Sequence, residues 1–269
     1  MEVCIPLLSN ILPQDIADER KESNNCCACS MSIFYCRELL TVRVLAWKKE
    51  SRRRNLFFSL PAAFPLSPHI RMVEDDVSYI SLHQVYEDFC NRSGVHKDQA
   101  IDFYVKSVED AMAMRTDKDN KDWLSNVKME IIQAIRQKIV PDTFLLDFFK
   151  RTFSTFPDLW LFRKQFTFQY ATIAFQTYLL AINNRYPQKL FFSRAKGNIW
   201  NTEMLPSLTP KVPTIINKDT VPFRYTPNIQ TFIGEVGLEG LFSCAIMAVA
   251  RCLSEPEVLA SIINTLIAV

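Results

Sequence analysis

The amino-acid sequence predicts an α+β fold that is mostly helical, with a few short strands near the N-terminal end and one hairpin in the second half. Twenty Phe against five Gly favour a crowded helical interior over a sheet protein rich in tight turns. Apolar residues recur at every fourth position of one segment, as Val127, Ile131, Ile135 and Ile139, which is typical of one helix face. The stretch 166–182 has no charged residue and is followed by short segments of a different period, which indicates a long buried helix and then a hairpin.

Size and composition are those of a globular protein. The 269 residues suffice for one large domain or two small ones, and 48% of them are hydrophobic against 22% charged. The formal net charge of +2 is too small to indicate a nucleic-acid or membrane partner. The chain begins with an acidic residue, Glu2, and shows no secretory signal. Segment 166–182 is short and carries Thr, Gln and Tyr, so we expect a core helix there and no membrane span.

Residues 1–46 show no sustained periodicity and are predicted to form an irregular segment of low order. Eight Cys without a signal peptide indicate a reducing compartment and free thiols. Four of them crowd together and in principle suffice for a zinc ion: Cys26, Cys27, Cys29 and Cys36. Their spacing matches neither a finger nor a ribbon, so we predict no metal site.

A basic run, Lys48–Arg54, follows. It is compatible with a nuclear-import signal or a nucleic-acid patch. No aromatic residues interleave with its charges to stack on bases, so a solvated loop or helix end is the better interpretation. We therefore expect no direct, sequence-specific contact with nucleic acid.

Short strands are predicted next, over 56–60, 62–66 and 70–73, with Pro61 between the first two. Ser81 is suited to cap a helix that ends near Gly94. Further helices are predicted over 98–114, 123–139, 142–149 and 159–182, with a charged linker at 116–121. A polar loop at 183–188 leads to strands at 189–193 and 198–200. An irregular Pro-rich stretch, 206–227, precedes a helical pair at 238–253 and 256–268.

The polar loop between a buried helix and a hairpin is where kinases carry their catalytic groups. An Asp takes the substrate proton there, an Asn a few residues on binds one metal ion, and an Asp after the hairpin binds the other. In the phosphatidylinositol-3-kinase-related branch the loop reads D-R-H-x-x-N, whereas here 184–189 reads N-R-Y-P-Q-K. Asn184 cannot act as a general base, Tyr186 replaces the His, and Lys189 puts a cation at a metal-binding position. Glu203, where D-F-G would begin, retains a carboxylate.

Longer motifs carry a resemblance to one family. Segments 56–58, 65–68 and 71–76 resemble the inter-lobe hinge of the TRRAP/Tra family of pseudokinases, and D-L-W-L-F-R-K-Q-F at 158–166 resembles the same family. So do V-P-F-R-Y-T-P-N-I-Q at 221–230, L-E-G at 238–240 and A-R-C-L at 250–253. The similarity covers roughly residues 47–260 and is greatest to the fungal members.

The resemblance implies a kinase-like fold of the phosphatidylinositol-3/4-kinase type. Its parts would be a remnant N-lobe and hinge at 47–80 and a helical C-lobe at 81–269. It further implies a catalytically inactive scaffold in the nucleus, within SAGA- and NuA-type histone acetyltransferase complexes that act on chromatin. Its partners would be subunits of those complexes and transcription activators.

Two features depart from the family. Residues 1–46 do not resemble an N-lobe, and no Gly precedes Gly94, which excludes a glycine-rich phosphate-binding loop. The chain also stops at Val269 inside a predicted helix, before the family's C-terminal tail. We expect an incomplete N-lobe to leave the apolar surface around Phe57, Phe58 and Phe64 uncovered.

A working active site is the alternative interpretation, in which the chain still binds ATP or is an active kinase of the same branch. It depends on Glu203, with Asp219 in addition. His69, His83 and His96 are far in sequence from the loop and are predicted to be surface or structural residues. We assign no catalytic residue, no cofactor and no metal ligand.

Overall fold

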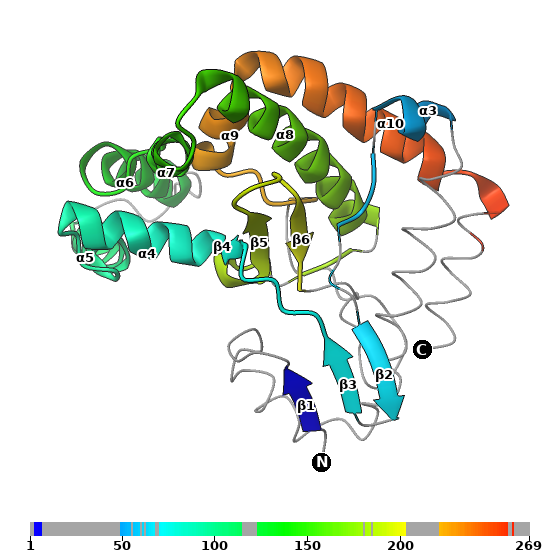
Figure 1. Cartoon of the computed structure of the whole chain (residues 1–269). Helices are drawn as coiled ribbons and strands as arrows, with labels where there is room; N and C mark the ends of the chain where they lie inside the picture. The colour runs from blue at the N-terminus through cyan, green and yellow to red at the C-terminus, as the bar shows by residue number, and fades with distance from the viewer. Residues whose placement is uncertain are drawn as a thin grey trace, which may run out of the picture.

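The computed structural model describes residues 3–6, 49–54, 56–59, 61, 63–67, 70–114, 123–179, 181–183, 185–202, 221–257 and 260. Its elements form a helical body and two small sheets (Figure 1). This arrangement confirms the predicted α+β fold class.

The first sheet has the order β1-β3-β2, from β1 (Val3–Pro6), β2 (Ala63–Ser67) and β3 (Ile70–Val73). β1 runs parallel to β3 and β2 antiparallel to it, with a register shift between Pro65 and Ser67. This sheet lies beside the helical body, at the bottom of Figure 1. The predictions of β2 and β3 are confirmed. β1 falls within residues 1–46, where we expected no regular structure, because pairing with a distant strand leaves no periodic signal in four residues.

The second sheet is antiparallel and has the order β4-β5-β6, from β4 (Tyr79–Ser81), β5 (Leu190–Ser193) and β6 (Ile199–Asn201). Tyr79 pairs with Ser193, and Phe191 pairs with Trp200. The hairpin β5–β6 confirms the prediction at 189–200. β4 was missed because its partner β5 lies more than 100 residues further along the chain.

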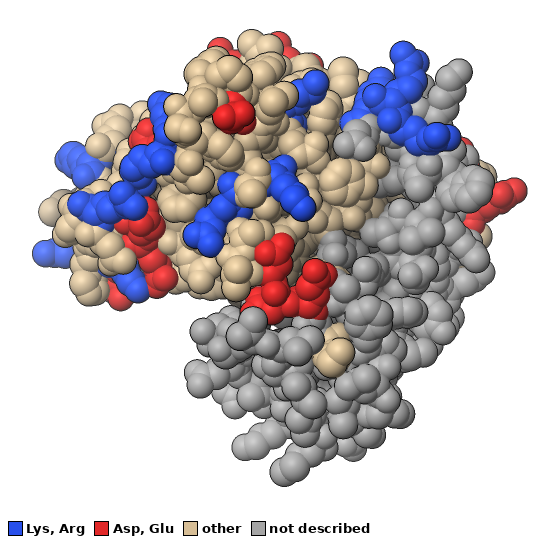
Figure 2. Space-filling view, in the orientation of Figure 1, with Lys and Arg blue, Asp and Glu red and all other residues tan. Residues whose placement is uncertain are grey.

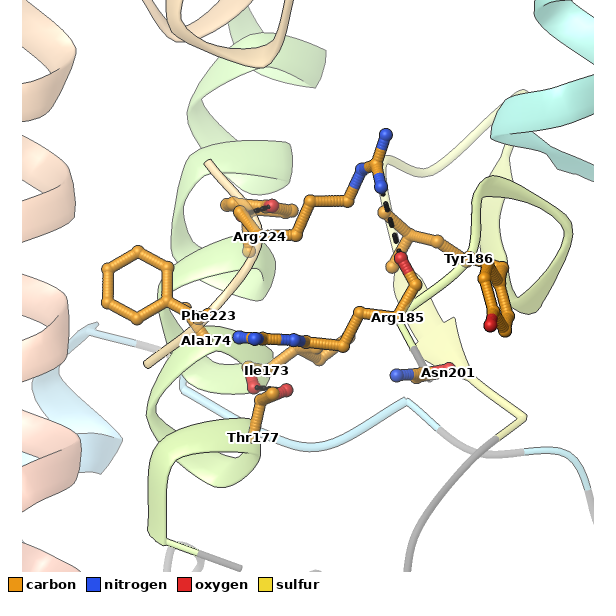
Figure 3. Close-up of a pocket in the computed structure, with 10 residues that line it drawn as sticks. Ile173, Ala174, Thr177, Arg185, Tyr186, Asn201, Phe223 and Arg224 are labelled. Atoms are coloured by element: carbon orange, nitrogen blue, oxygen red, sulfur yellow. Dashed lines mark hydrogen bonds between the residues drawn. The ribbon is translucent and has the colours of Figure 1, made fainter. Parts of the chain in front are cut away.

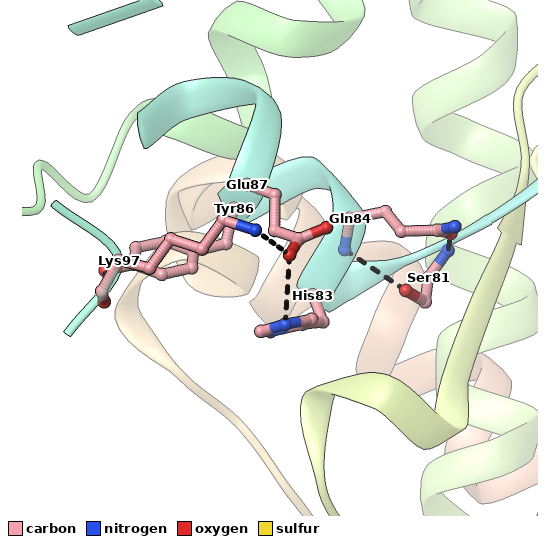
Figure 4. A network of polar contacts seen from close by, with 6 residues as sticks. All are labelled: Ser81, His83, Gln84, Tyr86, Glu87 and Lys97. Carbon is pink, nitrogen blue, oxygen red and sulfur yellow. Dashed lines mark hydrogen bonds and ion pairs between the residues drawn. The ribbon is translucent and has the colours of Figure 1, made fainter. Parts of the chain in front are cut away.

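Four helices follow β4 in sequence, ahead of the long helix α8. They are α4 (Leu82–Ser93), α5 (Gln99–Ala113), α6 (Trp123–Lys138) and α7 (Phe144–Thr152), and all four were predicted. α4 begins in a capping box, in which Gln84 N donates to Ser81 Oγ at 3.1 Å and Ser81 N donates to Gln84 Oε1 at 2.8 Å (Figure 4). It ends at Gly94, whose φ of 67° is left-handed.

α8 (Phe156–Leu179) is the long central helix, and α10 (Ser243–Leu253) packs along it (Figure 1). Phe166 and Ala171 are fully buried, as a helix without a polar face requires. Thr167, Thr172 and Thr177 satisfy their buried hydroxyls by donating to the carbonyls four residues earlier, at 2.7–2.9 Å. A cluster of ring contacts with centroids 4.5–6.4 Å apart forms the core around it: Phe149, Phe162, Phe166, Phe192 and Phe232.

Segment 56–59 is not the strand that we predicted; it is an extended piece without a strand partner. Leu56 and Phe58 belong to the hydrophobic core, and Gln169 Nε2 of α8 donates to the carbonyl of Phe57 at 2.9 Å. The expectation that this region is uncovered is therefore wrong for Phe58, which is 6% exposed, and Phe57 is half-buried. Phe64 lies in β2, but its side chain is not among those that the structure describes.

After the hairpin come α9 (Pro227–Ile233), a π-helical segment η4 (Gly237–Phe242) and α10. α9 was missed because the Pro-rich stretch before it indicated irregular structure up to 227. Helix 238–253 is confirmed, with its first turns wound as a π-helix. The linker 116–121, the whole of 206–220 and most of the predicted final helix 256–268 lie outside the described residues. No described helix is on its own long and apolar enough to cross a bilayer; α9 and Gly237–Leu253 meet that requirement only together, across a bend of 91°.

Candidate functional site

The loop at 184–189, where we expected degenerate kinase positions, begins just after α8 ends. Ala181 adopts a left-handed conformation with a φ of 47°, and Ile182 N donates to Thr177 O at 3.0 Å. This turn closes the helix in the way that Gly or Asn usually does. It directs Asn183 into a buried position and the following residues across the face of α8.

The hairpin is held against the same helix by its turn. Gly197 has a φ of 70°, and a Cβ placed on it would lie 2.9 Å from the carbonyl oxygen of Phe162. The turn therefore rests directly on the backbone of α8, and only Gly fits there. The loop thus lies between α8 and a hairpin that packs against the same helix.

Two arginines connect the loop to the segment before α9. Arg185 Nη2 donates to the carbonyl of Val221 at 2.7 Å, and Arg224 Nη1 donates to the carbonyl of Arg185 at 3.1 Å (Figure 3). Tyr170 on α8 adds a third contact by donating from its hydroxyl to the carbonyl of Arg224. The V-P-F-R segment is therefore fixed to the loop and to the central helix.

Burial dominates the electrostatics of this site. It lowers the pKa of the Arg224 guanidinium, and the neighbouring positive charge of Arg185 acts in the same direction. It raises the pKa of the Tyr170 hydroxyl, so this group remains a neutral hydrogen-bond donor. The Arg224 guanidinium stays charged at neutral pH, because the ordinary pKa of a guanidinium lies far above 7.

These contacts enclose a small space that we call the loop pocket. It is lined by Tyr170, Ile173, Ala174, Thr177, Arg185, Tyr186, Leu190, Asn201, Phe223 and Arg224. Its volume is about 20 Å³, which is room for one water molecule. None of these lining residues, which all belong to the described part of the chain, carries a carboxylate or an imidazole, so none of them is suited to take a proton from a hydroxyl nucleophile. The two guanidinium groups make the pocket electropositive, which disfavours a divalent cation.

Of the four degenerate kinase positions, the structure describes Tyr186 and Lys189, whereas Asn184 and Glu203 lie outside the described residues. Tyr186 is 57% exposed at the mouth of the loop pocket. Lys189 Nζ lies 5.9 Å from the Tyr186 ring centroid, a cation–π contact. The ammonium group at this position is therefore directed onto an aromatic ring.

Sequence reasoning missed Arg224 and Tyr170 as residues of this site. Arg224 was quoted only as part of a family motif, although a charged residue inside the apolar run V-P-F-R-Y was a signal that it has a buried partner. Tyr170 carried no comparable signal, because an aromatic residue on an apolar helix is ordinarily core.

His83 and His96 lie away from the loop pocket. His83 Nε2 is 3.6 Å from Glu87 on α4 (Figure 4), and His96 Nδ1 accepts from Asp98 N at 3.4 Å. Both positions agree with the predicted surface or structural role. His69, Asp219 and the cysteine cluster at 26–36 lie outside the described side chains. Within the described part of the chain no three His, Cys, Asp or Glu residues come close enough to hold a metal ion.

Comparison with known proteins gives consistent results. Residues 39–267 match the family described as phosphatidylinositol 3- and 4-kinase. The chain is 42% identical over 224 residues to the SAGA complex/NuA4 acetyltransferase complex subunit Tra1 of Schizosaccharomyces pombe, an alignment that covers 79% of the chain. It is 31% identical over 210 residues to the transformation/transcription domain-associated protein of Mus musculus, with 78% of the chain covered. The chain spans only 6% and 8% of the lengths of these two relatives.

The fold also matches solved structures. A Tel1 kinase dimer superposes with a TM-score of 0.65 at 21% identity, over 91% of this chain and 10% of that chain. This similarity shows the kinase-type fold. The higher identity to the fungal relative than to the mouse relative confirms the direction that the sequence motifs indicated.

Proposed function

This chain belongs to the phosphatidylinositol 3- and 4-kinase family and groups by similarity with Tra1 and the transformation/transcription domain-associated protein, and we propose that it is a member that binds proteins without transferring phosphate. Within this proposal, residues 47–80 are a remnant of the N-lobe with the hinge. Residues 81–269 are the helical C-lobe.

The composition of the loop pocket is the observation that carries the proposal. The loop at 184–189 is tied down by Arg185 and Arg224, and the pocket beside it has room for one water molecule. A phosphotransfer site needs a group that orients or deprotonates the nucleophile and ligands for magnesium. The described residues of this loop are Arg185, Tyr186, Pro187, Gln188 and Lys189, and none of them carries a carboxylate for either task.

The sequence adds support at two positions of the loop. Asn184 stands where the branch has its proton-accepting Asp, and an amide cannot take that proton. Lys189 stands where the branch has a metal-binding Asn, and its charge repels magnesium. Each change acts against the same step, which favours a lost activity over an altered one.

A role in a chromatin-modifying assembly follows from the relatives. The fission-yeast relative is named as a subunit of the SAGA and NuA4 acetyltransferase complexes. We extend this to the present chain, as part of a nuclear subunit that docks transcription activators and neighbouring subunits. The fold suits such a role, because a rigid core around α8 presents several elements at fixed relative positions.

Affinity purification tests this role. The tagged chain is recovered from nuclear extract, and the eluate is assayed for histone acetyltransferase activity and analysed by mass spectrometry. We expect acetyltransferase subunits with the chain and not with a Tel1 kinase domain treated in the same way. Eluates with the same composition for both proteins would contradict the proposed assembly.

A further inference from the structure

A second and much larger hollow lies on the surface, between α3 (Lys49–Arg54), the N-terminal half of α8, the β5–β6 turn and η4. We call it the basic groove. It encloses about 860 Å³ and is open to solvent, which is the size of ligand sites in proteins, about 300–1,000 Å³. None of its residues belongs to the loop pocket.

The floor of the basic groove is apolar. Phe153, Leu161, Phe162, Phe168 and Leu241 contribute to it. Leu161 is 61% exposed, which is unusual for a leucine on the central helix, whereas Phe162 beside it is buried in the core. Partly exposed apolar side chains in a hollow mark a site that a partner can cover.

The rim of the basic groove is positively charged. Arg53, Arg54, Lys164 and Lys196 line it, from three separate elements. The one carboxylate among the lining residues is that of Asp158, which accepts from Thr155 Oγ1 at 2.5 Å. Figure 2 shows Lys and Arg side chains over α3 at the upper right and further ones near the middle of the face, with uncharged surface between them.

We propose that the basic groove binds an acidic, amphipathic peptide segment of a partner protein. The segment would place leucine or aromatic side chains against Leu161 and Phe168 and carboxylates against Lys164 and Lys196. Apolar anchors supply affinity in such helix-in-groove contacts, and complementary charges supply rate and orientation. The inference does not depend on the proposed loss of phosphotransfer.

A peptide fits this groove better than a nucleic acid does. Bases bind single-stranded sites by stacking on exposed aromatic faces. Phe162 is 3% exposed, and Phe153 and Phe168 are half-buried, so their faces are largely taken up by the core. Aliphatic Leu161 and Leu241 are suited to side chains of the same kind.

The test uses the full 269-residue chain and a fluorescently labelled probe peptide. The probe is a designed helix with Leu and Phe on one face and Asp and Glu on the other. Its controls are a scrambled peptide of equal composition and a peptide with Gln in place of every acid. We expect saturable binding of the probe that weakens with salt, and weak binding of both controls. Equal binding of the scrambled peptide, or no binding of the probe, would overturn the proposal.

Matched variants locate the site. The double reversal Lys164→Glu with Lys196→Glu should weaken binding about tenfold or more, and Leu161→Ala severalfold. The control double reversal is Lys106→Glu with Lys138→Glu, which makes the same charge change at exposed positions of α5 and α6. Met129→Ala, at a 65% exposed position, is the control for Leu161→Ala.

The same variants distinguish peptide binding from nucleic-acid binding at the groove. Equal effects of groove and control reversals would show that only net charge matters and would contradict the proposal. Tighter, groove-dependent binding of a DNA duplex or an oligonucleotide than of the peptide would assign the groove to nucleic acid instead. All four substituted residues of the reversals are exposed, and melting curves check that each variant is folded.

Discussion

Arg224 and Arg185, 39 residues apart in sequence, are joined by a hydrogen bond from Arg224 Nη1 to the backbone carbonyl of Arg185 at 3.1 Å. Arg185 in turn donates to the carbonyl of Val221 at 2.7 Å. Two like charges lie side by side here, and each donates a hydrogen bond to a backbone oxygen. The consequence is a loop that both guanidinium groups tie to the segment before α9.

Removal of the Arg224 side chain should destabilise the protein. Arg224→Met keeps the apolar stem and loses the hydrogen bond to Arg185, so we expect a loss of about 1.5–3 kcal/mol in the free energy of unfolding, measured with urea. Arg251→Met is the control, because Arg251 is exposed on α10 and should tolerate the change within about 0.5 kcal/mol. Equal effects of the two substitutions would show that the contact contributes nothing.

Two glycines form a matched pair that tests the packing of the hairpin on α8. Gly94→Ala and Gly197→Ala impose the same left-handed strain, since their φ angles are 67° and 70°. Nothing lies within 4 Å of a Cβ at Gly94, whereas at Gly197 it would lie 2.9 Å from Phe162 O. We expect a cost of about 1 kcal/mol for Gly94→Ala and about 2–4 kcal/mol for Gly197→Ala, from thermal or urea unfolding. A similar cost at both sites would mean that the turn does not rest on α8.

The helix cap at Ser81 can be isolated in the same way. Ser81→Ala removes the capping box of α4 and should cost about 1 kcal/mol. Thr143→Ala is the control, because Thr143 occupies the N-cap position of α7 without a side-chain hydrogen bond to the backbone. Unfolding of both variants should show a larger effect at Ser81, and the reverse order would contradict the capping geometry.

Acid should weaken one surface contact of α4. The hydrogen bond from Lys97 holds the pKa of Glu87 below its ordinary value of 4.5 (Figure 4). A carboxyl with a lowered folded-state pKa stabilises the protein above its unfolded pKa, and this contribution is lost as the pH falls. We expect the difference in melting temperature between the protein and Glu87→Gln to shrink between about pH 6 and pH 3. A difference that does not change over this range would show that the pair is not formed in solution.

Local signals in the sequence predicted much of the fold, and long-range contacts account for what they missed. Ser81 and Gly94 mark the two ends of α4 by chemistry that lies within a few residues of each end. The uncharged interior of α8 predicted its burial for the same reason. Segment 56–59 was mistaken for a strand, because a short apolar run looks the same whether it pairs in a sheet or packs on a core. Here it packs on the core, and its Phe57 carbonyl accepts a hydrogen bond from Gln169, 112 positions away.

The site was predictable in its location and not in its contacts. The loop at 184–189 was found from its place between a buried helix and a hairpin, and the structure describes Tyr186 and Lys189 there. The link between Arg185 and Arg224 depends on how two distant segments fold against α8, which no local spacing reveals. The assignments of Asn184, Tyr186, Lys189 and Glu203 as degenerate kinase positions stay predictions.

Magnesium-dependent ATP binding is the most direct test of our proposal that the chain does not carry out phosphotransfer. Calorimetric titration of the chain with ATP, with and without magnesium, is compared with a Tel1 kinase domain under the same conditions. We expect no magnesium-dependent heat of binding and no phosphate transfer from labelled ATP. Magnesium-dependent ATP binding that is lost in Glu203→Ala would contradict the claim and would identify a working active site.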